Sequence, residues 1–234
     1  MKSLIFSLFL INLTAWSQLN DRFSISQLNY GESNGTSMNN SIVQGSHRFY
    51  IGDSTIVSAN LAYLQFNISD ENNDISPPDK NRNFYSLITN FSFITSLNNK
   101  NNLITIIRPG FFGDGNGNIG EDFRLEGGFI YTNQFSNQLT MGLGAARGTN
   151  LGRDLIVPLF QFTYYMTDKI TISGVLPVKA SIWYIHNDKW QYGGFFRLEG
   201  SVYNIDDSSL PKAQAVGIGH ALIGGSTRYF LNES

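Results

Sequence analysis

Charged side chains occur in the same short segment, Phe-Arg-Leu-Glu-Gly, at residues 123–127 and again at residues 196–200. In each copy the Arg and the Glu are two residues apart, so on a β-strand they share one face while Phe and Leu take the other. An Arg that faced lipid near the midplane would cost about 2 to 4 kcal/mol, so the charged face is expected to point away from any lipid. These inward-facing residues are Arg124, Glu126, Arg197 and Glu199. We favour structural ion pairs over a role in ligand binding or selectivity.

A second group of candidate ligands lies in the polar segment 113–122. Oxygen-bearing side chains recur there at nearly alternate positions, as a hard cation such as calcium would require. They are Asp114, Asn116, Asn118, Glu121 and Asp122. The EF-hand pattern fails, however, because its sixth position would be Ile119 and its twelfth Leu125. A polar loop without metal is the favoured interpretation, with calcium the alternative, and no other cofactor is expected.

The catalytic signatures in the sequence lack their structural context. The chain has no cysteine and three histidines, His47, His186 and His220. Residues 31–35 match G-x-S-x-G around Ser33, but no helical pattern follows them, as a nucleophile elbow requires. Residues 115–120 match G-x-G-x-x-G without a βαβ context. Ser46 and His47 are adjacent and would face opposite ways on a strand. We therefore predict no enzyme, and a lipid esterase or phospholipase is the alternative.

The elements that would position these residues are β-strands. From residue 21 onward, apolar and polar residues alternate with period two between clusters of Asn, Gly, Asp and Ser. The stretch 84–97 is clearest, with Tyr85, Leu87 and Phe91 on one face and small polar residues on the other. Twelve strands are predicted: 21–31, 41–51, 55–69, 84–97, 102–112, 123–135, 139–146, 155–166, 170–176, 178–185, 190–204 and 215–231.

The connections between these strands alternate in length. Short ones are expected at 52–54, 98–101, 136–138, 167–169 and 186–189, and longer ones at 32–40, 70–83, 113–122, 147–154 and 205–214. Transmembrane barrels have this arrangement, with tight periplasmic turns and longer outer loops. Only 15% of the residues are charged, against about 25% in ordinary soluble domains. We therefore predict an all-β, antiparallel, up-and-down transmembrane barrel of about twelve strands, and a soluble secreted β-sandwich is an alternative.

The N-terminus has the pattern of an export signal. A charged start, Met1-Lys2, precedes a ten-residue apolar run at 4–13 and a small-residue cleavage site at 15–17. We predict a signal peptide over 1–17 and a barrel domain over 18–234. The polar tail after Tyr229 resembles the predicted short turns, so truncation at a turn, with twelve strands as a lower limit, is left open.

The segment 167–204, together with the signal peptide, resembles the single-chain outer-membrane β-barrels of Gram-negative bacteria, and more narrowly a family of such barrels without an established activity. The resemblance implies an outer-membrane location and supplies no functional residues. The expected role is a passive narrow pore, porin-like, or a conduit for a small solute or lipid. Outer-membrane lipid and the barrel assembly machinery are the expected partners. Nucleic acid is not, because the net charge is −2 and no Lys/Arg cluster occurs.

Overall fold

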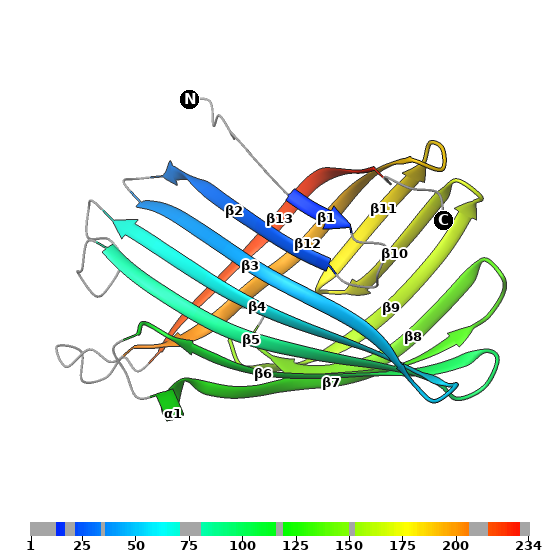
Figure 1. The fold of residues 1–234 in the computed structure, drawn as a ribbon, viewed down its shortest axis with the longest axis horizontal. Coiled ribbons are helices and arrows are strands. Elements are labelled where there is room, and N and C mark those ends of the chain that lie inside the picture. The colour runs from blue at the N-terminus through cyan, green and yellow to red at the C-terminus, as the bar shows by residue number, and fades with distance from the viewer. Residues whose placement is uncertain are drawn as a thin grey trace.

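The computed structural model describes residues 13–16, 22–33, 36–70, 81–115, 119–149, 153–205 and 215–229. They form one sheet of thirteen strands in which each strand pairs antiparallel with the next along the chain (Figure 1). The strands are β1 (Leu13–Trp16), β2 (Arg22–Ser33), β3 (Thr36–Ile51), β4 (Thr55–Asp70), β5 (Asn81–Ser96), β6 (Asn101–Gly113), β7 (Phe123–Gln134), β8 (Leu139–Gly148), β9 (Leu155–Thr167), β10 (Ile170–Leu176), β11 (Lys179–Ile185), β12 (Trp190–Asn204) and β13 (Ala215–Tyr229). The short helix α1 (Ile119–Asp122) precedes β7.

Each predicted strand overlaps one of β2 to β13, and the all-β class is confirmed. The loop predicted at 32–40 is wrong, because β2 continues to Ser33 and β3 starts at Thr36. Ser33 pairs with Thr36 in the β2–β3 register, so residues 32–33 and 36–40 belong to the sheet. Alternation cannot identify a strand whose two faces are both polar, and for this reason the sequence predicted a loop here.

Polar side chains close the tight turns at one end of the sheet. Asn98, Ser136, Thr167 and Asn187 each accept hydrogen bonds from two backbone N–H groups of their own turn, at 2.9 to 3.2 Å. Such side chains mimic a backbone turn and make short reversals favourable. These turns lie at the right-hand end of Figure 1, whereas α1 lies at the left-hand end.

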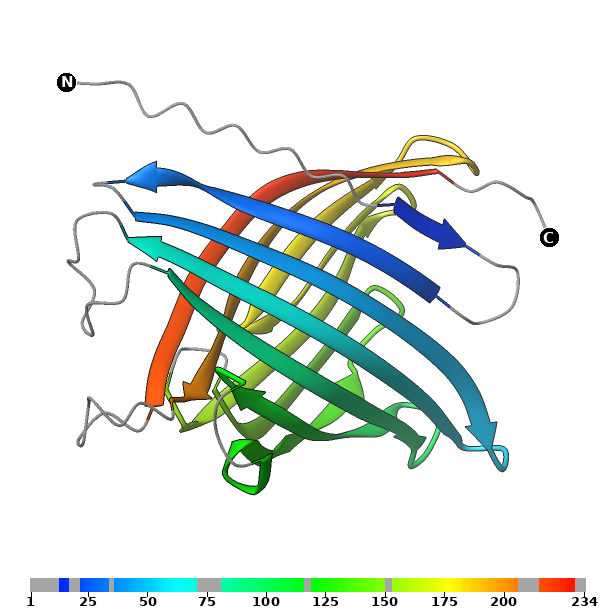
Figure 2. The ribbon, with the colours of Figure 1, turned by 60° about the vertical axis from the view of Figure 1, so that its left-hand side comes forward.

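The sheet curls so that β3 to β5 face β10 to β13 across an interior (Figure 2). One parallel pairing, between Gly113 of β6 and Asn204 of β12, closes a ring of the seven strands β6 to β12. The remaining strands extend the sheet beyond this ring. Among the described residues, no pairing joins β2 to β13, as a closed twelve-stranded barrel would require. Instead β1, within the predicted signal peptide, pairs with β2 from Leu13–Ile25 to Trp16–Arg22.

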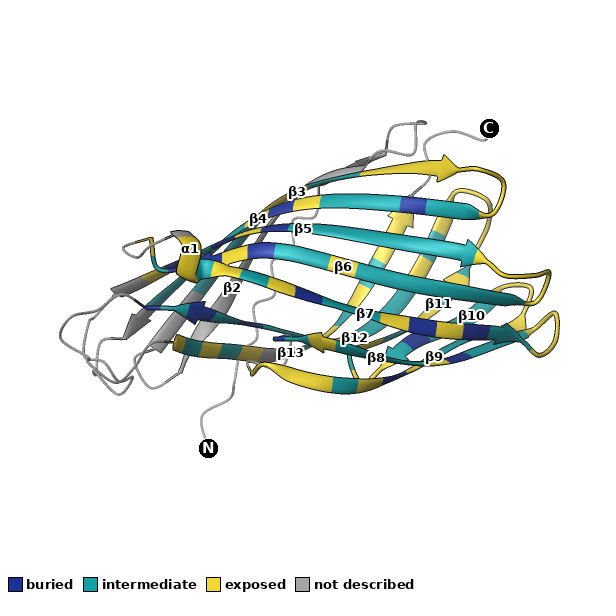
Figure 3. Cartoon of the chain, turned by 90° about the horizontal axis from the view of Figure 1, so that it is seen from below, coloured by how far each residue is buried: buried dark blue, intermediate teal, exposed yellow. Residues whose placement is uncertain are grey.

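The two faces of the sheet differ in chemistry. On β7 the exposed side chains are Phe123, Leu125, Phe129 and Tyr131, while Glu126, Ile130 and Thr132 are buried on the opposite face. We call the buried side the inner face and the other the outer face. The division on β7 follows the predicted alternation. Figure 3 shows the mixture of buried and exposed positions along the strands. In the described part of the chain, no helix is long and apolar enough to cross a membrane.

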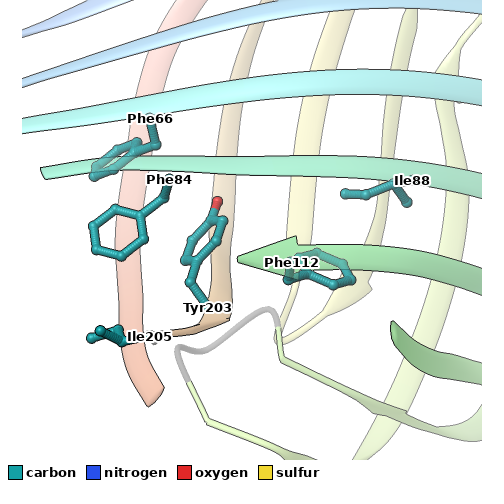
Figure 4. Packing of buried hydrophobic residues seen from close by; sticks show 6 residues of the cluster. All are labelled: Phe66, Phe84, Ile88, Phe112, Tyr203 and Ile205. Carbon is teal, nitrogen blue, oxygen red and sulfur yellow. The ribbon is translucent and has the colours of Figure 1, made fainter. Parts of the chain in front are cut away.

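The inner face carries an apolar cluster close to the β6–β12 pairing. Its buried members are Phe66, Phe84, Ile88, Phe112, Tyr203 and Ile205. The rings of Phe84 and Tyr203 lie side by side with centroids 5.1 Å apart, and Phe112 is 6.3 Å from Tyr203 (Figure 4). These residues come from β4, β5, β6, β12 and the residue after β12, so the cluster fills the interior at the α1 end.

Candidate functional site

Glu126 is the most deeply buried charged side chain of the predicted inner set. Its side chain is 7% exposed, and its Oε1 accepts hydrogen bonds from the Thr149 backbone N–H and hydroxyl at 2.9 and 2.6 Å. Its Oε2 lies 3.1 Å from Nη1 of Arg108, which is opposite Glu126 in the β6–β7 register. Burying a carboxylate is unfavourable unless it is paired and hydrogen-bonded. The Arg108–Glu126–Thr149 network meets that requirement.

Arg124 does not pair with Glu126, although the two share the inner face of β7. Its Nη2 donates a hydrogen bond to Asn204 Oδ1 at 2.5 Å, and Asn204 Nδ2 donates to the backbone carbonyl of Glu121. These bonds join β7, β12 and α1 at the point where Asn204 also pairs with Gly113. Arg124 therefore holds the ring closed rather than completing an ion pair with Glu126.

A small hollow of about 170 Å³ lies beside this network. It is lined by Arg124, Leu125, Glu126, Arg147, Thr149 and Asp154. At its rim, Arg147 donates two hydrogen bonds to the Asp154 carboxylate, at 2.8 and 3.2 Å, and both side chains are more than half exposed. The hydrogen bond from Arg147 lowers the pKa of Asp154 below its usual range. In α1, by contrast, burial raises the pKa of Asp122.

The second charged segment, on β12, forms an ion pair within one strand. Arg197 Nη1 lies 2.7 Å from Glu199 Oε1, with the side chains 51% and 26% exposed. The Arg197 guanidinium also lies 5.6 Å from the centroid of the Phe195 ring. Lys179, the first residue of β11, is directly opposite Arg197 in the β11–β12 register. Two cations and one carboxylate thus occupy neighbouring positions.

Calcium binding at 113–122 stays a prediction. Asp114, Glu121 and Asp122 are described, while Asn116 and Asn118 lie outside the described residues. Within the described ranges, no group of three or more His, Asp or Glu side chains is arranged to hold a metal ion. The carboxylate of Asp122 lies against Gly113, so closely that a Cβ there would collide with it. Of the described carboxylates of this segment, that of Asp122 therefore packs against the end of β6.

The residues of the catalytic alternatives are spread over the sheet. Ser33 lies in β2, and His47 stacks on Phe49 in β3 with ring centroids 5.9 Å apart. His186 lies in a turn between the rings of Tyr184 and Tyr192, at 6.3 and 6.1 Å. His220 pairs with Glu199 in the β12–β13 register, and its side chain is outside the described part. None of these contacts is between a serine and a histidine, so none of them supports the lipid-hydrolase alternative.

Sequence reasoning missed Arg108, Thr149, Lys179 and Asn204. Arg108 and Glu126 are opposite each other on β6 and β7, which are joined by the segment 114–122. The length of that segment does not fix the pairing register of the two strands. The sequence contains a weak indication for Lys179, which starts a strand directly after a two-residue turn. In the period-two pattern of that strand, Lys179 lies on the same face as Ser181 and Trp183. That pattern alone could have placed it on the inner face.

A family model described as a domain of unknown function (DUF6268) matches residues 52–233. No curated protein matches the chain. The matched residues include every strand from β4 to β13 and all of the inner-face charges described above.

Proposed function

Since the chain belongs to the DUF6268 family of unknown function, we propose a role on the basis of the surface of the protein itself. We propose that it is a membrane-spanning β-barrel of the bacterial outer membrane that provides a narrow passive conduit for a small solute. The observation that carries this proposal is the apolar outer face. Every strand from β3 to β13 exposes at least one large apolar side chain, for example Leu61, Leu143 and Ile223 at 53%, 68% and 78%. A water-soluble protein rarely exposes a contiguous apolar surface beyond a few hundred Å².

The aromatic residues near the tight turns support the same location. Exposed Tyr131, Tyr164, Tyr184, Trp190 and Tyr192 all lie within a few residues of a turn at that end of the sheet. Aromatic side chains gather at the boundary between lipid and water, because one part of each ring system is apolar and another is polar. The exposed apolar side chains and the aromatic residues near one end of the sheet therefore both support the proposed membrane location.

The interior supports a conduit that is narrow rather than wide. The cluster around Phe84, Phe112 and Tyr203 fills the α1 end, whereas the inner face elsewhere mixes apolar side chains such as Ile130 with polar and charged ones such as Glu126 and Thr132. Apolar constrictions of this kind restrict ion passage by excluding water when they are closed. We propose that the cluster is the constriction of the conduit. Outer-membrane lipid around the barrel and the barrel assembly machinery are the partners that this proposal requires.

Export would also change the edge of the sheet. Removal of residues 1–17 takes away β1 and leaves the β2 edge unpaired, and β13 lies at the opposite edge of the sheet. Exposed edges favour pairing with another strand, so we propose that β2 and β13 pair in the mature protein and close a barrel of twelve strands. Because the chain has no cysteine, cysteine pairs introduced in β2 and β13 report this contact directly. Crosslinking of the mature protein supports closure, and failure of every pair along both strands contradicts it.

Two measurements test the proposed function. Membrane fractionation with heat-dependent gel mobility should place the protein in the outer-membrane fraction, with unheated samples migrating differently from heated ones. Planar bilayers containing the purified mature protein should then show small, discrete conductance steps. A protein that remains soluble without detergent would contradict the membrane location. A correctly inserted protein without conductance would contradict the proposed conduit but not the proposed membrane location.

A further inference from the structure

We propose that the solute passed by this conduit is a small anion, an inference that rests on the proposed function and names its substrate class. Lys179 and Arg197 are directly opposite each other on neighbouring strands. They share the inner face with Ser201 and Tyr203, because Arg197 differs from these buried residues by an even number of positions along β12. Like charges at opposite positions destabilise a sheet, and Glu199, the carboxylate 2.7 Å from Arg197, balances only one of these two positive charges.

The inner face as a whole has an excess of positive charge. Among residues whose side chains the structure describes, six basic and two acidic residues occupy strand positions that alternate onto the inner face. These are Arg48, Arg108, Arg124, Lys179, Arg197 and Arg228 against Glu126 and Glu199. The formal net charge of the whole chain is −2, so the positive interior is not a consequence of a basic composition.

The two carboxylates are already engaged. Glu126 is held by Arg108 and Thr149, and Glu199 is 2.7 Å from Arg197. Other acidic residues, such as Asp53, Asp168 and Asp188, are exposed in the tight turns outside the interior. A cation entering the conduit would therefore meet mostly like charge, whereas an anion would be attracted.

Lys179 and Arg197 are also placed where a solute can reach them. Strands β10 and β11 have seven residues each, fewer than the nine to eleven of a strand that spans a membrane, and their connecting turn ends near the middle of β12. Lys179 is exposed and Arg197 is 51% exposed, although both occupy strand positions that alternate onto the inner face. The planar guanidinium and the ammonium suit carboxylate or phosphate oxygens as well as chloride.

Reversal potentials in planar bilayers under a potassium chloride gradient test the proposal. The wild-type protein should pass chloride in preference to potassium. The double variant K179E/R197E should lower the chloride-to-potassium permeability ratio by roughly tenfold, because it replaces two attractive charges with repulsive ones. The matched control K169E, in the exposed turn 168–169, changes the same kind of charge away from the interior and should leave the ratio unchanged.

The milder variant K179Q separates selectivity from folding. It should keep heat-dependent gel mobility and still reduce the ratio. Potassium preference in the wild type, or equal ratios for wild type, K179Q and K179E/R197E, would overturn the anion proposal while the conduit stands. Absence of conductance in folded, inserted protein would overturn the conduit and the anion proposal with it.

Discussion

Arg108 on β6 and Glu126 on β7 face each other across the inner side of the sheet, with Nη1 and Oε2 3.1 Å apart and side chains 21% and 7% exposed. Within the described residues, Oε2 accepts no hydrogen bond and is held by the ion pair alone, while Oε1 is bound by Thr149. Removing one partner of a buried pair leaves the other charge uncompensated. The pair therefore links the strands next to the ring closure.

Glu126→Gln should destabilise the folded protein by about 3 to 5 kcal/mol, because it removes the carboxylate from a buried ion pair with Arg108. Glu199→Gln is the matched control, and it should cost at most about 1 kcal/mol because the Arg197–Glu199 pair is partly exposed. Urea denaturation of the protein in detergent, followed by tryptophan fluorescence, measures both. Equal costs for the two variants would show that Glu126 is not the buried anchor we describe.

Phe112→Ala should raise the single-channel conductance, because Phe112 is fully buried in the apolar cluster that we propose as the constriction. Its neighbour Phe111 faces outward and is 38% exposed, so Phe111→Ala removes a ring of the same size from the other face. The control should conduct like the wild type. Unchanged conductance in a folded Phe112→Ala protein would mean that the passage is limited elsewhere.

Acid should loosen the ends of β8 and β9. The pKa of Asp154 in the folded protein is below its usual value because of the hydrogen bond from Arg147. The stability that this bond contributes is therefore complete above the unfolded pKa of about 3.9, and it is lost as the pH falls through the lower pKa of the folded protein. Hydrogen exchange at Gly148 and Leu155, corrected for intrinsic rates, should therefore accelerate in strong acid. The Asp154→Asn variant should exchange faster already at neutral pH and show no such acid step. An identical pH profile in both proteins would refute this role of Asp154.

Leu143→Arg should impair membrane assembly, because Leu143 is 68% exposed in the middle of β8 and an Arg facing lipid costs about 2 to 4 kcal/mol. Leu97→Arg, at a 53% exposed position in the turn 97–100, should be tolerated because water reaches the turn. The yield of the heat-modifiable form in membranes compares the two. Full assembly of Leu143→Arg would indicate that this face does not contact lipid.

Period-two alternation predicted the strands and the faces of β7 because local sequence determines both. Phe123 and Leu125 are exposed and Glu126 is buried, as the pattern indicates. Alternation could not identify the partner of Glu126, since the register between β6 and β7 depends on contacts across nine intervening residues. It also could not predict how the sheet closes. The pairing of Gly113 with Asn204 joins strands far apart in the sequence, and it depends on the curl of the whole sheet.

Single cysteines on β7 test most directly whether the outer face meets lipid while the inner face meets water, because the natural chain has no cysteine. Fluorophores at Phe129 and Tyr131 on the outer face, and at Arg124 and Thr132 on the inner face, would be studied in liposomes with a lipid-borne and a water-soluble quencher. We predict that the lipid-borne quencher acts on Phe129 and Tyr131 alone. Equal quenching of all four labels by the water-soluble agent, with none by the lipid-borne one, would contradict a membrane-spanning barrel.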